Sequence, residues 1–200
     1  MPFLSYLHSK SDITDILFRN PRRFSSLNFF TNKLLRGKSE LNIAERELIA
    51  AFVSATNACN YCAGIHTAVA ERFGVDPSVI QVLVEDIDTA PVSDKMKPIL
   101  KLSQKLTLSP VKMQESDVEA IKNVGWSEQT VEDVVCITGL FNFYNRLLEG
   151  HGIKGFPEIF EEGSMYLKKH GYNIPGFVAR FLLWRKNRKM KKTLAMSSIQ

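Results

Sequence analysis

Residues 47–74 read ELIAAFVSATNACNYCAGIHTAVAERFG, and the rest of the chain is organised around this stretch. Cys59 and Cys62 form a C-x-x-C pair, and His66 follows the second cysteine by four residues. In a helix these three positions fall on successive turns of one face. The spacing therefore places two thiols close enough to form a disulfide, with an imidazole one turn away. Such an arrangement suits redox chemistry better than packing.

The sequence before this pair predicts a buried helix that carries one carboxylate. Asn42 and Glu45 have the spacing of a capping box, which marks the start of a helix. The run from Leu48 to Val53 is apolar all round, which is typical of a buried helix. An ionised Glu47 beside this run is costly unless it is paired or hydrogen-bonded. The alternative is a partly exposed first-turn acid that the helix dipole favours.

The remaining sequence also predicts helices. Residues 56–58 interrupt the first buried helix, and a second one is expected from about Cys59 to Gly74. No segment shows the alternation of apolar and polar residues expected of strands. The expected fold class is therefore all-α, in a single domain. Further helices are expected at 13–19, 21–36, 77–86, 96–108, 116–125, 129–148 and 157–169.

Composition and length fit one soluble globular domain. The 200 residues are 44% hydrophobic and 24% charged, which is ordinary for such a protein. Three cysteines are too few for a secreted disulfide framework, and neither a signal peptide nor a membrane-spanning run is expected, so the chain is predicted to be cytoplasmic. Seven of the 26 basic residues lie in 176–200, which leaves 19 basic and 21 acidic residues before them. Nucleic-acid binding is not expected, because it needs a basic folded body.

The motif C-x-x-C-x-x-x-H has two interpretations that do not involve catalysis. Two thiolates and an imidazole supply three zinc ligands, but a closed structural site needs a fourth. The remaining cysteine, Cys136, lies among apolar residues of a helix and is predicted to be a core residue. The group could also be a structural part of the core. Either interpretation would describe a non-enzymatic, metal-stabilised or interaction protein.

The third interpretation, redox catalysis, uses every residue of the motif. A free thiol has a pKa of about 8.5, so little thiolate is present at neutral pH. An imidazole can accept the thiol proton, and Glu47 could fix the tautomer of that imidazole. A thiolate that attacks a hydroperoxide becomes a sulfenic acid, with which the second cysteine condenses to form a disulfide. An external dithiol must then reduce this disulfide, and no haem, flavin or metal is required.

These residues resemble the active-site pattern of the AhpD-like alkylhydroperoxidases. That family belongs to the carboxymuconolactone decarboxylase superfamily, and the resemblance is closest to its peroxidase-related branch. It rests on Glu47, the C-x-x-C pair and His66, and on residues 141–152, FNFYNRLLEGHG, which resemble the Phe-Asn…Asn-Arg signature of that branch. The resemblance implies an AhpD-like helical fold. It also implies an obligate homo-oligomer (a dimer, trimer or hexamer), in which another subunit completes each catalytic unit.

The resemblance also implies a role for each residue of the motif. Cys62 resembles the peroxidatic cysteine, and Cys59 resembles the resolving and more accessible partner. His66 resembles the proton-relay histidine, and Glu47 its carboxylate partner.

This chain departs from the best-known members of the family at one position. They have a histidine immediately before the second cysteine, where this chain has Tyr61. A phenol with a pKa of about 10 can donate a hydrogen bond but is no base at neutral pH. Thiol–disulfide exchange on another substrate is therefore an alternative to reduction of organic hydroperoxides. Tyr61 and Asn142 are the candidate substrate-binding residues.

Three parts of the chain are expected on this basis. They are an N-terminal arm (1–23), an AhpD-like helical core with the C-x-x-C site (24–160), and a C-terminal extension with a basic tail (161–200). If helical, the tail has an apolar face formed by Phe177, Phe181 and Trp184. The tail could lie on an anionic membrane surface. We favour docking of this face on the oligomer, with the basic remainder solvated.

Overall fold

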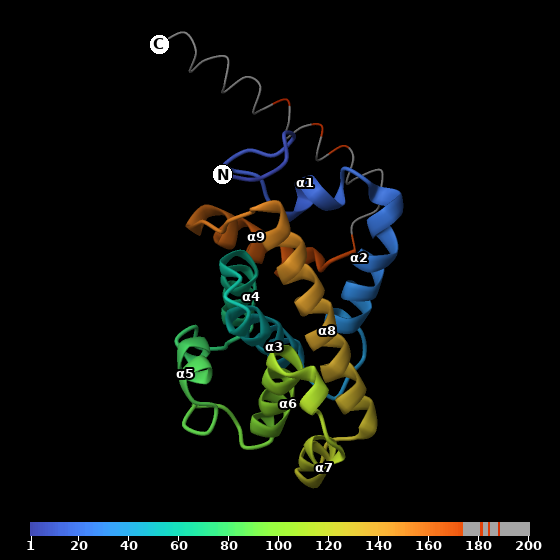
Figure 1. Ribbon diagram of the computed structural model, residues 1–200, viewed down its shortest axis with the longest axis vertical. Helices are drawn as coiled ribbons and strands as arrows, with labels where there is room; N and C mark the ends of the chain where they lie inside the picture. The colour runs from blue at the N-terminus through green and yellow to red at the C-terminus, as the bar shows by residue number, and fades with distance from the viewer. Residues whose placement is uncertain (174–180, 182–183, 185–187, 189–200) are drawn as a thin grey trace.

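The computed structural model describes residues 1–173 together with residues 181, 184 and 188. Every regular element in these parts is a helix, which confirms the expected all-α class (Figure 1). The expectations for the tail fall outside the described residues, apart from the exposed side chains of Phe181, Trp184 and Arg188. The elements are α1 (Ile13–Leu17), α2 (Pro21–Arg36), α3 (Ile43–Thr56), α4 (Asn60–Arg72), α5 (Val79–Glu85), α6 (Met96–Leu108), the 3-10 turn η1 (Pro110–Lys112), α7 (Glu115–Asn123), α8 (Glu128–His151) and α9 (Pro157–His170).

Helix α3 lies in the core, and its sequence explains both its start and its burial. The Asn42 side chain accepts from the Glu45 amide at 3.0 Å, and the Glu45 carboxylate accepts from the Asn42 amide at 2.8 Å. The predicted capping box is therefore confirmed. Every residue from Arg46 to Ser54 is buried, because α4, α6 and α8 all pack against α3.

A tight turn joins α3 to α4 and places the C-x-x-C pair. Helix α3 ends at Thr56, and Ala58 takes a left-handed conformation, with φ of 54°. The amide of Cys59 then donates back to the Ser54 carbonyl at 2.9 Å. The predicted interruption is confirmed, and it leaves Cys59 as the N-cap residue of α4.

Several predicted helix boundaries differ from the structure by a few residues, and local features explain those of α5 and α8. Helix α5 begins at Val79 instead of residue 77, because the Asp76 carboxylate accepts from the Ser78 amide at 2.9 Å and holds a turn there. Helix α8 continues to His151 instead of ending at residue 148. Its end is set by Gly152, whose φ of 68° is left-handed and suits glycine.

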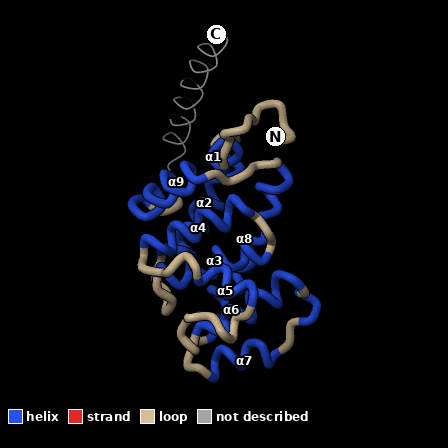
Figure 2. Tube along the Cα trace, turned by 90° about the vertical axis from the view of Figure 1, so that its left-hand side faces the viewer, coloured by secondary structure: helices blue, strands red, loops and turns tan. Residues whose placement is uncertain are grey.

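Two views of the molecule show an elongated arrangement in which the ends are built by different helices (Figures 1 and 2). Helices α1 and α9 lie near the end with the N-terminus, whereas α7 lies at the opposite end. The long helix α8 connects the two ends. Cys136, on α8, is partly exposed, so the prediction that it belongs to the core is wrong. None of the described helices is long and apolar enough to cross a membrane.

Candidate active site

The C-x-x-C pair lies at the N-terminal end of α4, with both thiols free and buried. The Cys59 residue is 0% exposed and Cys62 is 3% exposed. Cys59 is therefore not the more accessible partner that the resemblance implies. The turn after α3 directs its side chain into the main hydrophobic core.

The two thiols differ in their affinity for protons. A hydrogen bond from the Cys62 thiol lowers the pKa of Cys59, and this effect exceeds the opposing effects of burial and of the nearby Glu149. The same contact, together with burial, raises the pKa of Cys62 well above its ordinary value. The hydrogen bond between the two thiols therefore favours a thiolate at Cys59 and disfavours one at Cys62. Cys62 needs a base at the moment when it reacts.

His66 lies one helical turn beyond Cys62 and is hydrogen-bonded to Glu47 of α3. The distance from Nδ1 of His66 to Oε2 of Glu47 is 2.7 Å, and the Glu47 side chain is completely buried. A carboxylate can only accept, so Nδ1 carries a hydrogen and Nε2 is left for proton exchange. The ring of Phe141 meets the imidazole edge-on, with centroids 4.5 Å apart. Glu47 and His66 are therefore in contact, although the sequence alone could not show that Glu47 reaches His66.

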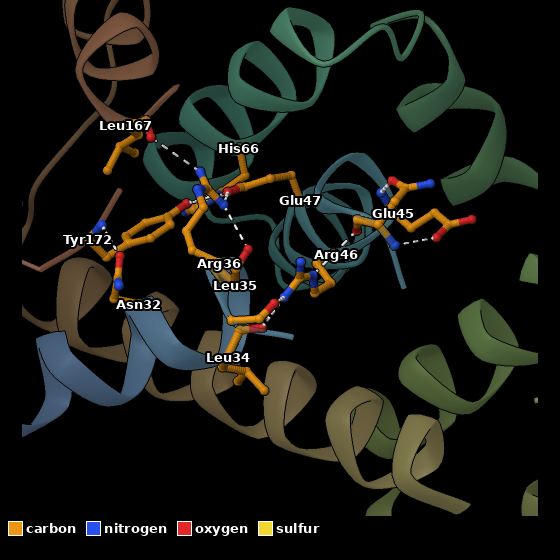
Figure 3. A network of polar contacts seen from close by, with 12 residues as sticks. Asn32, Leu34, Leu35, Arg36, Glu45, Arg46, Glu47, His66, Leu167 and Tyr172 are labelled. Carbon is orange, nitrogen blue, oxygen red and sulfur yellow. Dashed lines mark hydrogen bonds and ion pairs between the residues drawn. The ribbon is translucent and has the colours of Figure 1, made fainter. Parts of the chain in front are cut away.

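Two further side chains hold the Glu47 carboxylate (Figure 3). Arg36, in the last turn of α2, places Nη1 2.5 Å from Oε1 of Glu47. The hydroxyl of Tyr172, which follows α9, donates to the same oxygen at 2.7 Å. The Arg36 guanidinium also lies over the Tyr172 ring, 4.9 Å from its centroid. Segments far apart in the sequence therefore meet at one carboxylate.

These contacts keep Glu47 ionised inside the protein. Complete burial by itself raises the pKa of Glu47, but the hydrogen bond and charge of His66, the charge of Arg36 and the Tyr172 hydroxyl outweigh it. The pKa of Glu47 is therefore held below its ordinary value. Burial and the Glu47 charge raise the pKa of Tyr172 well above its ordinary value, so this residue stays a phenol and a donor.

A cavity of about 270 Å³ opens onto Cys62 and His66. Cys59 and Glu47 are not among its lining residues, so Cys59 lies behind Cys62, and Glu47 lies behind His66. Most of its walls are apolar or aromatic, and they come from α1, α4, α8, α9 and the segment after α9. A molecule in this cavity would meet one thiol and one imidazole in a largely apolar space.

Tyr61 lines the same cavity and contacts the N-terminal segment. Its hydroxyl accepts from the Ile13 amide at 3.4 Å, a long hydrogen bond that joins α1 to α4. Burial, followed by the charge of Asp12, raises the pKa of Tyr61 well above its ordinary value. Tyr61 therefore remains protonated at neutral pH and supplies a neutral polar group to the cavity wall.

Asn142, the other candidate substrate-binding residue, is not among the residues that line the cavity. Its amide nitrogen donates to Oγ1 of Thr107 at 3.0 Å, and its oxygen accepts from Nδ2 of Asn57 at 3.1 Å. The structure thus places Asn142 in a network that connects α8 with α6 and the end of α3.

Asn145, one turn further along α8, contacts the reactive pair instead. Its oxygen accepts from Nδ2 of Asn57 at 2.8 Å, and its nitrogen donates to Oγ of Ser54 at 3.0 Å. The amide is therefore oriented with its N–H groups on the side of Cys62, and donation to that sulfur opposes the rise in the pKa of Cys62. Asn145 is placed to stabilise negative charge on the sulfur of Cys62.

Three residues around the site are not found by sequence reasoning. Arg36 has no distinguishing signal, since a basic residue in the last turn of a helix is ordinary. Tyr172 lies in a region of weak periodicity. Asn145 does belong to the Phe-Asn…Asn-Arg signature, which could have pointed to it. Among the described residues, no group of three or more His, Cys, Asp and Glu side chains is arranged to hold a metal ion.

The fold and the arrangement of this site define a class of AhpD-like helical proteins, and comparisons with known proteins agree. Residues 22–95 match the model of the carboxymuconolactone decarboxylase family. Over 110 residues the chain is 30% identical to the uncharacterized protein YdfG of Bacillus subtilis, which covers 55% of this chain and 75% of that protein.

Two solved structures have the same fold. An uncharacterized peroxidase-related protein from Silicibacter sp. TM1040 is 27% identical, with a TM-score of 0.68 over 73% of this chain and 76% of that one. A peroxidase-related protein from Ralstonia eutropha JMP134, described as an alkylhydroperoxidase AhpD core, is 25% identical, with a TM-score of 0.67 over 72% and 76%. The chain belongs to the AhpD/carboxymuconolactone decarboxylase superfamily.

Proposed function

We propose that this protein is a thiol-dependent peroxidase that reduces organic hydroperoxides through a Cys59–Cys62 dithiol–disulfide cycle. The observation that carries the proposal is that Cys62 and His66 line one cavity while Glu47 holds the far side of the imidazole. A nucleophile, a base and an orienting third group are the usual parts of nucleophilic catalysis. The likeness to proteins described as peroxidase-related supports the same reaction class.

In the first step Cys62 attacks the terminal oxygen of the hydroperoxide while Nε2 of His66 takes the thiol proton. A sulfur–oxygen bond forms, the oxygen–oxygen bond breaks, and the alkoxide receives that proton from His66 and leaves as an alcohol. Cys62 is then a sulfenic acid, with which Cys59 condenses to give a disulfide and water. The hydroperoxide has gained two electrons and the two thiols have lost them. An external dithiol restores the thiols by exchange.

The walls of the cavity favour an organic hydroperoxide over hydrogen peroxide. Apolar side chains such as Leu17, Ile65 and Phe141 line it, and burial of apolar substrate surface contributes roughly 25 cal/mol per Å². Hydrogen peroxide has no apolar surface to bury. We therefore expect kcat/KM to rise with the size of the alkyl or aryl group until the cavity is full.

The protein is also proposed to act as a homo-oligomer, as its resemblance to the family implies. Phe29 and Phe30 of α2 and Phe143 of α8 are exposed, which supplies apolar surface for contact with further copies. We propose no metal, haem or flavin for the cycle. The two thiols, His66 and an external dithiol account for every proton and electron in it.

A second candidate function, thiol–disulfide exchange on another substrate, is favoured by one observation. The pKa of Cys59 is lowered at the N-terminal end of a helix, as is common for the attacking cysteine of C-x-x-C oxidoreductases. Cys59 is buried behind Cys62, however, whereas exchange needs an accessible thiol. Peroxide reduction therefore has the better support.

The test is to titrate the reduced protein with cumene hydroperoxide and count free thiols after denaturation. The wild type should lose two thiols. Cys62→Ser should lose none, and Cys59→Ser should hold a sulfenic acid that dimedone traps. Cys136→Ser is the matched control, because it removes a thiol outside the site and should still lose two.

Survival of all three wild-type thiols in excess peroxide would overturn the peroxidase proposal. Incubation with oxidised glutathione would then test the second candidate, which requires loss of the Cys59 and Cys62 thiols. Inert thiols in both assays would leave the non-enzymatic interpretation.

A further inference from the structure

Glu149 interacts with Cys59, whereas Glu47 contacts His66, the residue beside Cys62. Glu149 has no part in the reaction described above. It is in the last turn of α8, and its carboxylate lies against the thiol of Cys59, whose pKa it raises. Cys59 does not line the cavity, whereas His66 and Cys62 do. The two cysteines therefore have different proton acceptors beside them.

The Glu149 carboxylate is held through one oxygen and open at the other. Oε2 accepts from Nζ of Lys154 at 2.8 Å. Oε1 is buried and accepts no well-formed hydrogen bond in the part of the chain that the structure describes. A buried carboxylate oxygen without a donor is costly. The Cys59 thiol interacts with this carboxylate and is therefore a group that can supply it with a proton.

The chain after α8 keeps this carboxylate in place. The left-handed turn at Gly152 folds the chain back, which lets Lys154 reach Glu149. The amide of Gly155 then donates to Oδ1 of Asn60 at 3.1 Å, and Asn60 lies between the two cysteines in the sequence. A Cβ at Gly155 would come within 2.4 Å of the Phe160 ring and 2.8 Å of that oxygen, so a larger residue would displace one or both. The segment that fixes Glu149 is thus bonded to the C-x-x-C turn itself.

We propose that Glu149 accepts the thiol proton of Cys59 as Cys59 attacks the oxidised sulfur of Cys62, an inference that rests on the proposed dithiol cycle. In this step the S–H bond of Cys59 breaks, the S–S bond forms and the S–O bond of the sulfenic acid breaks. The leaving hydroxide takes a proton from solvent, and Glu149, whose side chain is 36% exposed, returns its proton to solvent. One thiol and one sulfenic acid give a disulfide and water, with no further oxidant.

The need for this acceptor arises only after Cys62 has reacted. In the reduced protein the hydrogen bond from the Cys62 thiol favours ionised Cys59. Oxidation removes that thiol hydrogen, so that only the hydrogen bond from the Cys62 amide still favours a thiolate at Cys59, against burial and the charge of Glu149. A thiolate is then less favoured at the moment when Cys59 must become a nucleophile. A carboxylate in contact with it removes the proton during the attack instead of before it.

The test compares Glu149→Gln with the parent chain, both carrying Cys136→Ser, after rapid mixing with cumene hydroperoxide. Mass spectrometry of quenched samples separates sulfenic acid from disulfide. Formation of the sulfenic acid should keep its rate within about twofold, whereas its conversion to disulfide should slow about a hundredfold. Sulfinic acid should then accumulate in excess peroxide. Glu162→Gln, an exposed change of the same charge on α9, should behave like the parent.

A second measurement needs no peroxide. In chains that carry Cys62→Ser and Cys136→Ser, the pH midpoint of the ultraviolet absorbance of the Cys59 thiolate should fall in Glu149→Gln, because the carboxylate raises the pKa of Cys59. An unmoved midpoint, or disulfide formation at the parent rate, would overturn the role of Glu149. A parent chain whose thiols do not react with peroxide would overturn the proposed peroxidase function, and with it the step assigned to Glu149. The absorbance midpoint, which needs no peroxide, would still report whether Glu149 acts on Cys59.

Discussion

Glu47 is an ionised group with no exposed surface, surrounded by Arg36, His66 and Tyr172. Buried ion pairs contribute little net stability, because the cost of desolvating both charges offsets their attraction. Removal of one partner alone is nevertheless costly, since the remaining charge is left buried without a partner. The network of Figure 3 is therefore better explained as a device for orienting the imidazole than as a source of stability.

Glu47→Gln should reduce both activity and stability. We expect kcat/KM for cumene hydroperoxide to fall about a hundredfold, because the imidazole loses the acceptor that fixes its tautomer. The free energy of unfolding should fall by about 3 kcal/mol, because Arg36 loses its buried partner. Steady-state kinetics and urea unfolding measure the two effects.

Glu45→Gln is the control for this change, because it removes a carboxylate two residues earlier on α3. The hydrogen bond of Glu45 belongs to the helix cap, where glutamine can also accept it, so the change should cost less than about 1 kcal/mol and leave kcat/KM nearly unchanged. Equal kinetic effects of the two substitutions would contradict the role assigned to Glu47.

Helix α1 is short, but it supplies one wall of the cavity. Ile13, Thr14 and Leu17 line the cavity, and the Ile13 amide is bonded to Tyr61. These residues precede the part of the chain that matches the family model, which begins at residue 22. The N-terminal arm expected from the sequence is thus a part of the candidate site that need not be shared with relatives. We expect it to control the choice of substrate.

Ile13→Phe should alter substrate preference, because the larger ring occupies part of the cavity. We expect kcat/KM for cumene hydroperoxide to fall about tenfold, the scale of a steric change in an apolar pocket. The value for hydrogen peroxide should change less than about twofold. Val111→Phe, on the exposed turn η1, is the control and should change neither value. An equal loss for both peroxides would mean that α1 does not select the substrate.

The whole chain is needed to build the site, since its residues come from segments between α1 and Tyr172. Protonation of the Glu47 carboxylate is therefore expected to lower the free energy of unfolding of the whole chain. The pKa of this residue is lower in the folded protein than in the unfolded chain, where it is about 4.3. Its stabilising contribution is complete above the unfolded value and is lost as the pH falls through the folded value.

Unfolding by urea at several pH values should reveal this coupling. Below about pH 4.3 the free energy of unfolding of the wild type should fall more steeply than that of Glu47→Gln. Above about pH 5 the two curves should run parallel, because the carboxyl group is ionised in both states. Parallel curves over the whole range would show that Glu47 is not held ionised by its neighbours.

Local signals in the sequence predict much of the fold, whereas contacts between distant segments are not predictable in this way. The capping box at Asn42 and the break before Cys59 follow from the properties of adjacent residues, and both are confirmed. The approach of Arg36 and Tyr172 to Glu47 depends on the angles between helices, which no local pattern encodes. The burial of Cys59 was not predictable for a different reason, because it follows the left-handed conformation of Ala58, which a residue other than glycine seldom adopts.

The complete burial of Cys59 has a consequence for the kinetics of turnover. If the cavity is the route to the dithiol, the hydroperoxide and the external reductant must both enter through it and react at Cys62. The alcohol then has to leave before the reductant can enter, which is a ping-pong scheme. Each of the two substrates also occupies the entrance that the other requires. We therefore expect either one, in excess, to inhibit the enzyme competitively against the other.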